Sequence, residues 1–254
     1  MDRNLWGTNG NVLAFARSGN TLYIGGAFSQ VGPNTGGGIP LGVASGQPVT
    51  GYPPVAGQVL AVVPDGSGGW FIGGDFTAVG DVPRSHLAHI LAGGQVANWA
   101  PDPDATVRAL ALSGETLYIG GDFNEVGGQP RNRAAAIDIT TGVANVWDPS
   151  PSGVLFGYDA ISALAVRADT VYVGGNFTQI GGQSRSYLAA VDGHSGEALD
   201  WRADANYIIR AVTLSGSTAY VGGDFSLIGG QPRRRVAAVN LADGAVTDWD
   251  PYVG

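Results

Sequence analysis

Apolar residues in this chain occur in short runs separated by Gly, Pro, Asn and Asp, and the clearest set lies between residues 107 and 147. Four runs there, 107–112, 116–119, 134–138 and 143–147, are rich in Val, Ile, Leu, Ala and aromatic residues. Runs of this length that end at turn residues are typical of β-strands, and they are too short for helices of ordinary length. The pattern therefore predicts four antiparallel strands joined by tight turns.

This set of strands recurs five times along the chain. In every copy the second strand ends in the phrase Gly-Gly-x-Phe, and successive copies are 48, 47, 54 and 48 residues apart. The phenylalanines of the phrase are Phe28, Phe76, Phe123, Phe177 and Phe225. A nearly constant period of this length indicates a repeat architecture, and four antiparallel strands per repeat make a β-propeller blade.

We therefore expect an all-β fold, a five-bladed β-propeller with four antiparallel strands per blade. A single repeat is too short to bury a core of its own, so the whole chain, 1–254, is predicted to form one domain. The expected repeat units cover residues 7–52, 53–99, 100–147, 148–201 and 202–249.

An aromatic residue marks the fourth strand of each unit, and one more precedes the first unit. The six markers are Trp6, Tyr52, Trp99, Trp147, Trp201 and Trp249. Because there are six markers for five phrases, two arrangements are open. Either one of the two end strands closes the five units into a ring, or the chain is part of a longer series of repeats. Closure by residues 245–250 is favoured, because a closed ring has no exposed sheet edge.

Composition narrows the function classes. The 42 Gly and 14 Pro suit many tight turns, and the absence of Cys excludes disulfides and thiolate chemistry. The net charge is −8 and all 13 basic residues are Arg without a basic stripe, so we expect no binding to nucleic acid. No apolar run reaches the length of a membrane span, so no membrane insertion is expected, and residues 1–6 show no signal-peptide pattern.

The variable residue of the phrase covaries with an Arg nine positions later. The pairs are Asp75 with Arg84, Asp122 with Arg131, Asn176 with Arg185, and Asp224 with Arg233. The first unit has Ala27 and Gly36 at these positions, so both partners are missing together. We expect a structural ion pair in each unit, since an Arg fork holds a carboxylate well. The alternative is a ring of Asp side chains that binds a cation such as Ca²⁺.

The segment Tyr118–Pro149 combines Gly-Gly-Asp-Phe, the loop Val-Gly-Gly-Gln-Pro-Arg and an Ala-x-Ile-Asp strand before a turn glycine. In these motifs it resembles the bacterial delta-60 repeat, a β-propeller-type repeat. The likeness covers the whole chain and is weakest in the first unit. It implies an extracellular or cell-surface location and no established enzymatic activity. A weaker likeness links the Ala-Ile-Asp-x-x-Thr-Gly strand to pyrroloquinoline-quinone-type propellers, whose site residues we do not find here.

We expect a non-catalytic scaffold or protein-interaction module without catalytic, cofactor or metal site. Gly-Gly-Asp-Phe lacks the second acidic residue of the GGDEF cyclase signature, and each Ser falls in a turn rather than in a nucleophile elbow. Two alternatives remain open, a lectin-like propeller that binds a glycan, and a self-associating structural subunit of a surface filament or layer.

Two segments depart from the repeat. Residues 149–159 contain about six extra residues, among them Leu155, Phe156 and Tyr158, which we expect to form a partner-docking loop or to fold back over the blade edge. Residues 32–40 of the first unit replace the Gly-Gly-Gln-Pro-Arg loop. Any function is expected near these two departures.

Overall fold

The computed structural model describes residues 7–31, 35–154 and 160–251. In these residues it contains β-strands and no helix. The strands form five sheet units that follow one another along the chain, and neighbouring strands within each sheet pair antiparallel. The all-β part of the prediction is confirmed.

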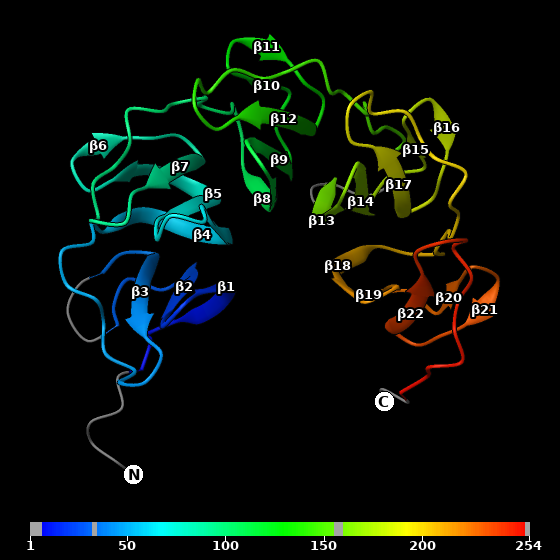
Figure 1. Cartoon of the computed structure of the whole chain (residues 1–254), viewed down its shortest axis with the longest axis horizontal. Coiled ribbons are helices and arrows are strands. Elements are labelled where there is room, and N and C mark those ends of the chain that lie inside the picture. Colours follow the sequence, from blue (N-terminus) through cyan, green and yellow to red (C-terminus); the bar gives the residue numbers. More distant parts are fainter. Residues whose placement is uncertain (1–6, 32–34, 155–159, 252–254) are drawn as a thin grey trace.

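The third unit shows the common plan. It contains β8 (Val107–Ser113), β9 (Thr116–Gly121), β10 (Glu125–Val126), β11 (Gln129–Pro130) and β12 (Ala134–Asp138). The sheet order is β12-β9-β8, with β8 on the inner side of the molecule and β12 toward the outside (Figure 1). Strands β10 and β11 form a separate hairpin, whose turn residues Gly127 and Gly128 have φ of 60° and 68°. Side chains rarely tolerate this left-handed region, so the turn requires glycine.

The other four units repeat this plan with local changes. The first contains β1 (Asn11–Ser18), β2 (Thr21–Ala27) and β3 (Gly38–Gly42). The second contains β4 (Val55–Pro64), β5 (Trp70–Val79), β6 (Val82–Pro83) and β7 (Leu87–Ile90), and β5 is long enough to pair with both β6 and β7.

The fourth and fifth units follow the third closely. The fourth contains β13 (Ile161–Arg167), β14 (Thr170–Gly175), β15 (Gln179–Ile180), β16 (Gln183–Ser184) and β17 (Leu188–Asp192). The fifth contains β18 (Ile209–Ser215), β19 (Thr218–Gly223), β20 (Leu227–Ile228), β21 (Gln231–Pro232) and β22 (Val236–Asn240).

The predicted fourth strand of each unit is reduced to a single β-bridge. In the third unit Ala144 bridges Ile137, and Val246 bridges Val239 in the fifth. The segment then leaves the sheet, because an Arg side chain binds the carbonyl of Asn145 and the following Trp147 turns into the junction with the next unit. The sheets therefore have three full strands in four of the units, rather than the four expected.

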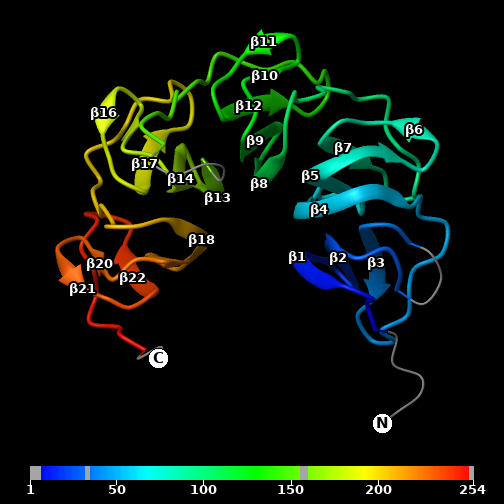
Figure 2. The same ribbon diagram turned by 180° about the vertical axis from the view of Figure 1, so that it is seen from behind.

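The units stand around an arc with the inner strands β1, β4, β8, β13 and β18 facing its centre (Figure 1). The view from behind shows the same opening between the first and fifth units (Figure 2). Residues 245–250 flank the outer edge of the fifth unit through the bridge of Val246, but the described residues do not form the closed ring that we expected.

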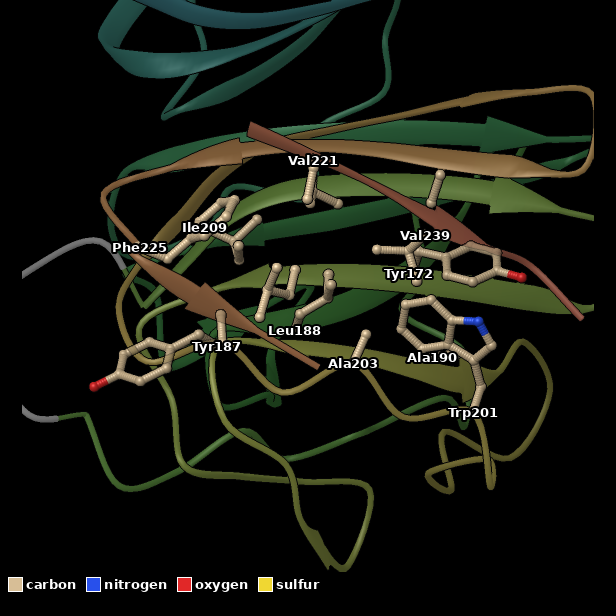
Figure 3. Packing of buried hydrophobic residues seen from close by; sticks show 14 of the residues in the cluster. Tyr172, Tyr187, Leu188, Ala190, Trp201, Ala203, Ile209, Val221, Phe225 and Val239 are labelled. Carbon is tan, nitrogen blue, oxygen red and sulfur yellow. The ribbon is translucent and has the colours of Figure 1, made fainter. Parts of the chain in front are cut away.

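The core is divided among the junctions between neighbouring units. At the last junction, Tyr172, Leu188 and Trp201 of the fourth unit pack against Ile209 and Val221 of the fifth (Figure 3). Comparable clusters join the first to the second unit, the second to the third and the third to the fourth. Each unit is therefore stabilised mainly by its sequence neighbours, as in other repeat proteins.

Candidate interaction surfaces

The second glycine of each Gly-Gly-x-Phe phrase serves its own unit. A Cβ at Gly121 would overlap with the carbonyl oxygen of Thr106, just before the inner strand of the same sheet. The matching glycines of the other four units face the same obstruction. In the third unit, the inner strand β8 carries a β-bulge, seen as a register shift between Val107 and Ala109. Glycine is needed because the bulged strand approaches the second strand too closely for a side chain.

The first glycine serves the next unit. A Cβ at Gly174 would lie 2.6 Å from Cγ2 of Ile209, and one at Gly73 would lie 2.6 Å from Cγ1 of Val107. We call the first glycines seats and the β-branched residues knobs. The seats are Gly25, Gly73, Gly120, Gly174 and Gly222; the knobs are Val12, Val59, Val107, Ile161 and Ile209. Every knob that has a preceding unit fills its seat, and these four knobs are 0% exposed.

The tryptophan markers of the second, third and fourth units also make contacts across a junction. Trp147 Nε1 donates a hydrogen bond of 2.9 Å to the carbonyl of Asp192 at the end of β17, and its ring packs edge-on against Tyr118 with centroids 5.1 Å apart. Trp99 and Trp201 donate in the same way to the carbonyls of Asp138 and Asn240. A buried indole gains from such a partner, so these contacts lock adjacent units together.

The arginine that follows the phrase in the second to fifth units binds backbone carbonyls. One bond goes to the preceding residue and the other to the residue two positions before the aromatic marker. The bonds run from Arg84 to Pro83 and Ala97, from Arg131 to Pro130 and Asn145, from Arg185 to Ser184 and Leu199, and from Arg233 to Pro232 and Thr247. The guanidinium thus ties the fourth segment to the hairpin of its own unit.

The expected pairing of this arginine with the acidic residue of the phrase therefore needs correction. Asp122 instead accepts a bond of 2.8 Å from Nε of Arg108, and Asp224 one of 2.7 Å from Nε of Arg210. Asp75 lies 3.7 Å from Nδ1 of His86. Asn176 is fully buried, whereas its expected partner binds carbonyls.

The reason for this difference is the hairpin after the phrase. It carries the arginine to the outer edge of the sheet, while the acidic residue stays beside the inner strand. A sequence signal for the true arrangement existed, because the arginine also covaries with the tryptophan that ends its unit. The first unit, which lacks the arginine, has Tyr52 in place of tryptophan.

The two ends of the arc carry the same kinds of residue, but in the described part of the chain no neighbouring unit covers them. The knob of the first unit, Val12, is 45% exposed, and we call the surface around it the start face. In the fifth unit a Cβ at the seat Gly222 would find no heavy atom closer than 3.7 Å. Tyr220 and Trp249 stack edge-on beside it and are 37% and 45% exposed. Gly222, Tyr220 and Trp249 define the end face.

The inner strands of all five units line a shared cavity of about 430 Å³. Most of its lining residues are apolar, with Leu13, Phe15, Leu60 and Leu110 on the side of the first three units, but polar atoms form about half of its surface. Arg210 brings the only charge among its lining residues. Phe15 is 73% exposed. Exposed apolar side chains of this kind suit contact with another protein segment.

A larger hollow of about 630 Å³ lies between the first and second units, beside the departure at residues 32–40. Its lining includes Asn9, Phe28, Gly37, Val55 and Gln58. Asn9 Oδ1 accepts hydrogen bonds from the backbone amides of Ser29 and Gln30, and Asn9 Nδ2 donates one to Ser29 Oγ, so this side chain supports the loop rather than the hollow.

The second unit contains a buried His–Asp pair. His89 Nε2 lies 2.9 Å from Asp65, whose side chain is 3% exposed, and the imidazole stacks on Phe71 with centroids 4.1 Å apart. Burial acts to raise the pKa of Asp65, but hydrogen bonds from His89, Ser67 and the Gly69 amide hold that pKa below its ordinary value. The pair joins the β4–β5 turn to β7 and so stabilises this unit.

The expected docking residues Leu155, Phe156 and Tyr158 lie outside the described residues. Among the residues that the structure describes, no group of three or more His, Asp or Glu is placed to hold a metal ion. The described part of the chain also has no helix of the length and apolarity needed to cross a membrane.

Comparison with known proteins supports the repeat fold. Residues 169–189 match the family model described as "Domain of unknown function (DUF5122) beta-propeller". A chain of a crystal structure of a nidogen–laminin complex is similar with a TM-score of 0.55 and 13% identity, over 94% of this chain and 80% of that one. The crystal structure of the computationally designed Ika8 protein is similar with a TM-score of 0.48 and 14% identity, over 96% of this chain and 88% of that one. No curated protein sequence matches significantly. The chain is thus an all-β protein built from β-propeller repeats.

Proposed function

We propose that this chain is a non-catalytic scaffold of the delta-60 type, with five units that act as propeller blades and a protein partner held against the inner strands. The carrying observation is the set of apolar side chains along the inner cavity, among which Phe15 is 73% exposed. Exposed apolar surface of this kind marks interaction sites on otherwise soluble proteins. By the resemblance stated above, the scaffold belongs to an exported or cell-surface bacterial protein.

The recurrent polar groups support a scaffold rather than an enzyme. The arginines bind carbonyls, the indole nitrogens of Trp99, Trp147 and Trp201 cross the junctions, and Asp138 and Asp192 accept bonds from backbone amides of their own turns. Those amide bonds hold the pKa of Asp138 and Asp192 below the ordinary value, so both stay charged and committed to the turns. The repeated chemistry is used to hold sheets together.

The lectin alternative is less favoured by the aromatic residues. A sugar-binding site in each unit needs an exposed ring, but Trp99, Trp147 and Trp201 are at most 7% exposed. The filament alternative is not favoured by a separate observation, and self-association is one outcome of the experiments below.

The test compares Phe15→Ser with Val146→Ser as a matched control, because Val146 is 86% exposed and lies outside the cavity. A protein captured from the surface extract of the encoding bacterium is purified and titrated against both variants, and a glycan panel is run in parallel. We expect Phe15→Ser to weaken the affinity about tenfold or more and Val146→Ser to leave it unchanged. Binding to glycans alone, or binding insensitive to Phe15→Ser, contradicts the proposal.

A further inference from the structure

The start face and the end face are the two halves of one junction. At the inner junctions a knob enters a seat, as Ile209 enters Gly174. At the ends, the knob Val12 is 45% exposed and the seat Gly222 is open. Neither half is degenerate, because Val12 keeps the β-branched side chain and Gly222 keeps the glycine.

The aromatic contact is divided in the same way. Trp249 is 45% exposed on the end face, whereas Trp147 of an inner junction is 0% exposed and bonded to the carbonyl of Asp192. On the start side, Gly42 pairs with Thr21 at the end of β3, in the register position that Asp138 holds opposite Thr116. The carbonyl of Gly42 therefore stands where an inner unit accepts the indole of its predecessor.

The start face belongs to the first unit and the end face to the fifth, and these two units border the same opening (Figures 1 and 2). A segment that fills the opening must offer a knob on one side and a seat on the other, and each inner unit of this chain has both. The sequence also has an aromatic marker, Trp6, in the phase of Trp249, so it contains one marker more than it has Gly-Gly-x-Phe phrases.

We propose that the opening is the docking site for one further repeat unit of the same kind. Its Val or Ile knob enters the Gly222 seat, its third strand accepts the indole of Trp249, and its own seat covers Val12. The occupant is thus a β-sheet unit recognised by shape and by one indole–carbonyl bond. This inference does not depend on the partner proposed for the inner cavity, and Phe15 has no part in its test.

The experiment extends the chain. A second copy of residues 202–249 is placed directly after Trp249, so that its copy of Ile209 faces Gly222 and its copy of Gly222 faces Val12. We expect Tm to rise by roughly 5 °C or more and binding of an apolar dye to fall, because repeat stability grows with each filled junction. An unchanged Tm, with the added segment cut rapidly by protease, overturns the proposal.

The control is Gly222→Val, made in both the original and the extended chain. In the original chain the open seat accommodates the side chain, so Tm should stay within about 1 °C, whereas Gly174→Val should lower it strongly. In the extended chain Gly222→Val should abolish the gain.

If Gly222→Val instead destabilises the original chain as much as Gly174→Val does, the end face is already covered and the proposal is wrong. Sedimentation then identifies the cover. A monomer means that the first unit of the same chain closes the ring, and an oligomer means that a second copy docks there.

Discussion

The junction between the third and fourth units and the free ends of the arc use the same residues with opposite results. At the junction, Ile161 and Trp147 are 0% exposed, but at the ends their counterparts Val12 and Trp249 are both 45% exposed. The local sequence is equivalent in both places, so the burial comes from the neighbouring unit. The residues of a repeat motif therefore stabilise the fold only where an adjacent unit packs against them.

The tryptophans should give the largest contrast. Trp147→Ala removes a buried ring and its bond to the Asp192 carbonyl, and we expect a loss of about 3–5 kcal/mol in the free energy of unfolding. Trp249→Ala should cost about 1 kcal/mol or less, because the ring is half exposed. Urea unfolding followed by circular dichroism measures both, and equal losses would mean that the end face is covered in solution.

The knobs should give the next contrast. Ile161→Ala leaves a cavity above Gly120, and we expect it to cost about 2–4 kcal/mol. Val12→Ala should change the unfolding free energy by less than about 0.5 kcal/mol, because no unit covers that side chain in the arc. The same denaturation experiment applies, and a large loss for Val12→Ala would contradict the open arc.

Arg185 and Arg233 allow the same comparison of a buried and a more exposed position for a contact within one unit. Arg185 is 7% exposed and bonded to the carbonyls of Ser184 and Leu199, so Arg185→Gln should cost about 1–3 kcal/mol. Arg233 makes the same bonds in the fifth unit but is more exposed, and Arg233→Gln should cost clearly less. Thermal melts of the two variants side by side provide the measurement, and the reverse order would show that burial does not set the strength of these bonds.

The smallest expected effect concerns Asp65. Its pKa in the fold is below the ordinary value near 4, so its charge stabilises the fold above that pH, and this stabilisation is lost as the pH falls through the folded pKa. The difference in the free energy of unfolding between the unsubstituted protein and Asp65→Asn should therefore be largest near pH 6 and become smaller in acid. This difference should be modest even near pH 6, since Asn keeps one acceptor oxygen for the turn amides. Asp169→Asn is the control for an exposed carboxylate, because Asp169 lies 4.0 Å from His194 with both side chains 78% exposed, and this substitution should change the free energy of unfolding little.

Much of the unit was predictable from the sequence because it rests on local rules. The spacing of Phe76, Phe123 and Phe177 indicated the repeat, and the β-branched runs indicated the strands. The partners of Asp122 and Arg131 were not predictable from spacing alone. Covariation along the chain shows that two residues are needed together, but it does not show whether they touch each other or support the same segment from two sides.

The sequence by itself determined the all-β repeat, the turn glycines and the positions of the Gly-Gly-x-Phe phrases, because these follow from backbone sterics and from a period that strand pairing must respect. The tertiary structure decided three things. It replaced the fourth strand by an arginine-held segment, it assigned the two glycines of each phrase to different units, and it left the arc open between Val12 and Gly222. These features depend on how one unit is placed against the next, and that placement results from side chains of two units packing together, which no single repeat encodes.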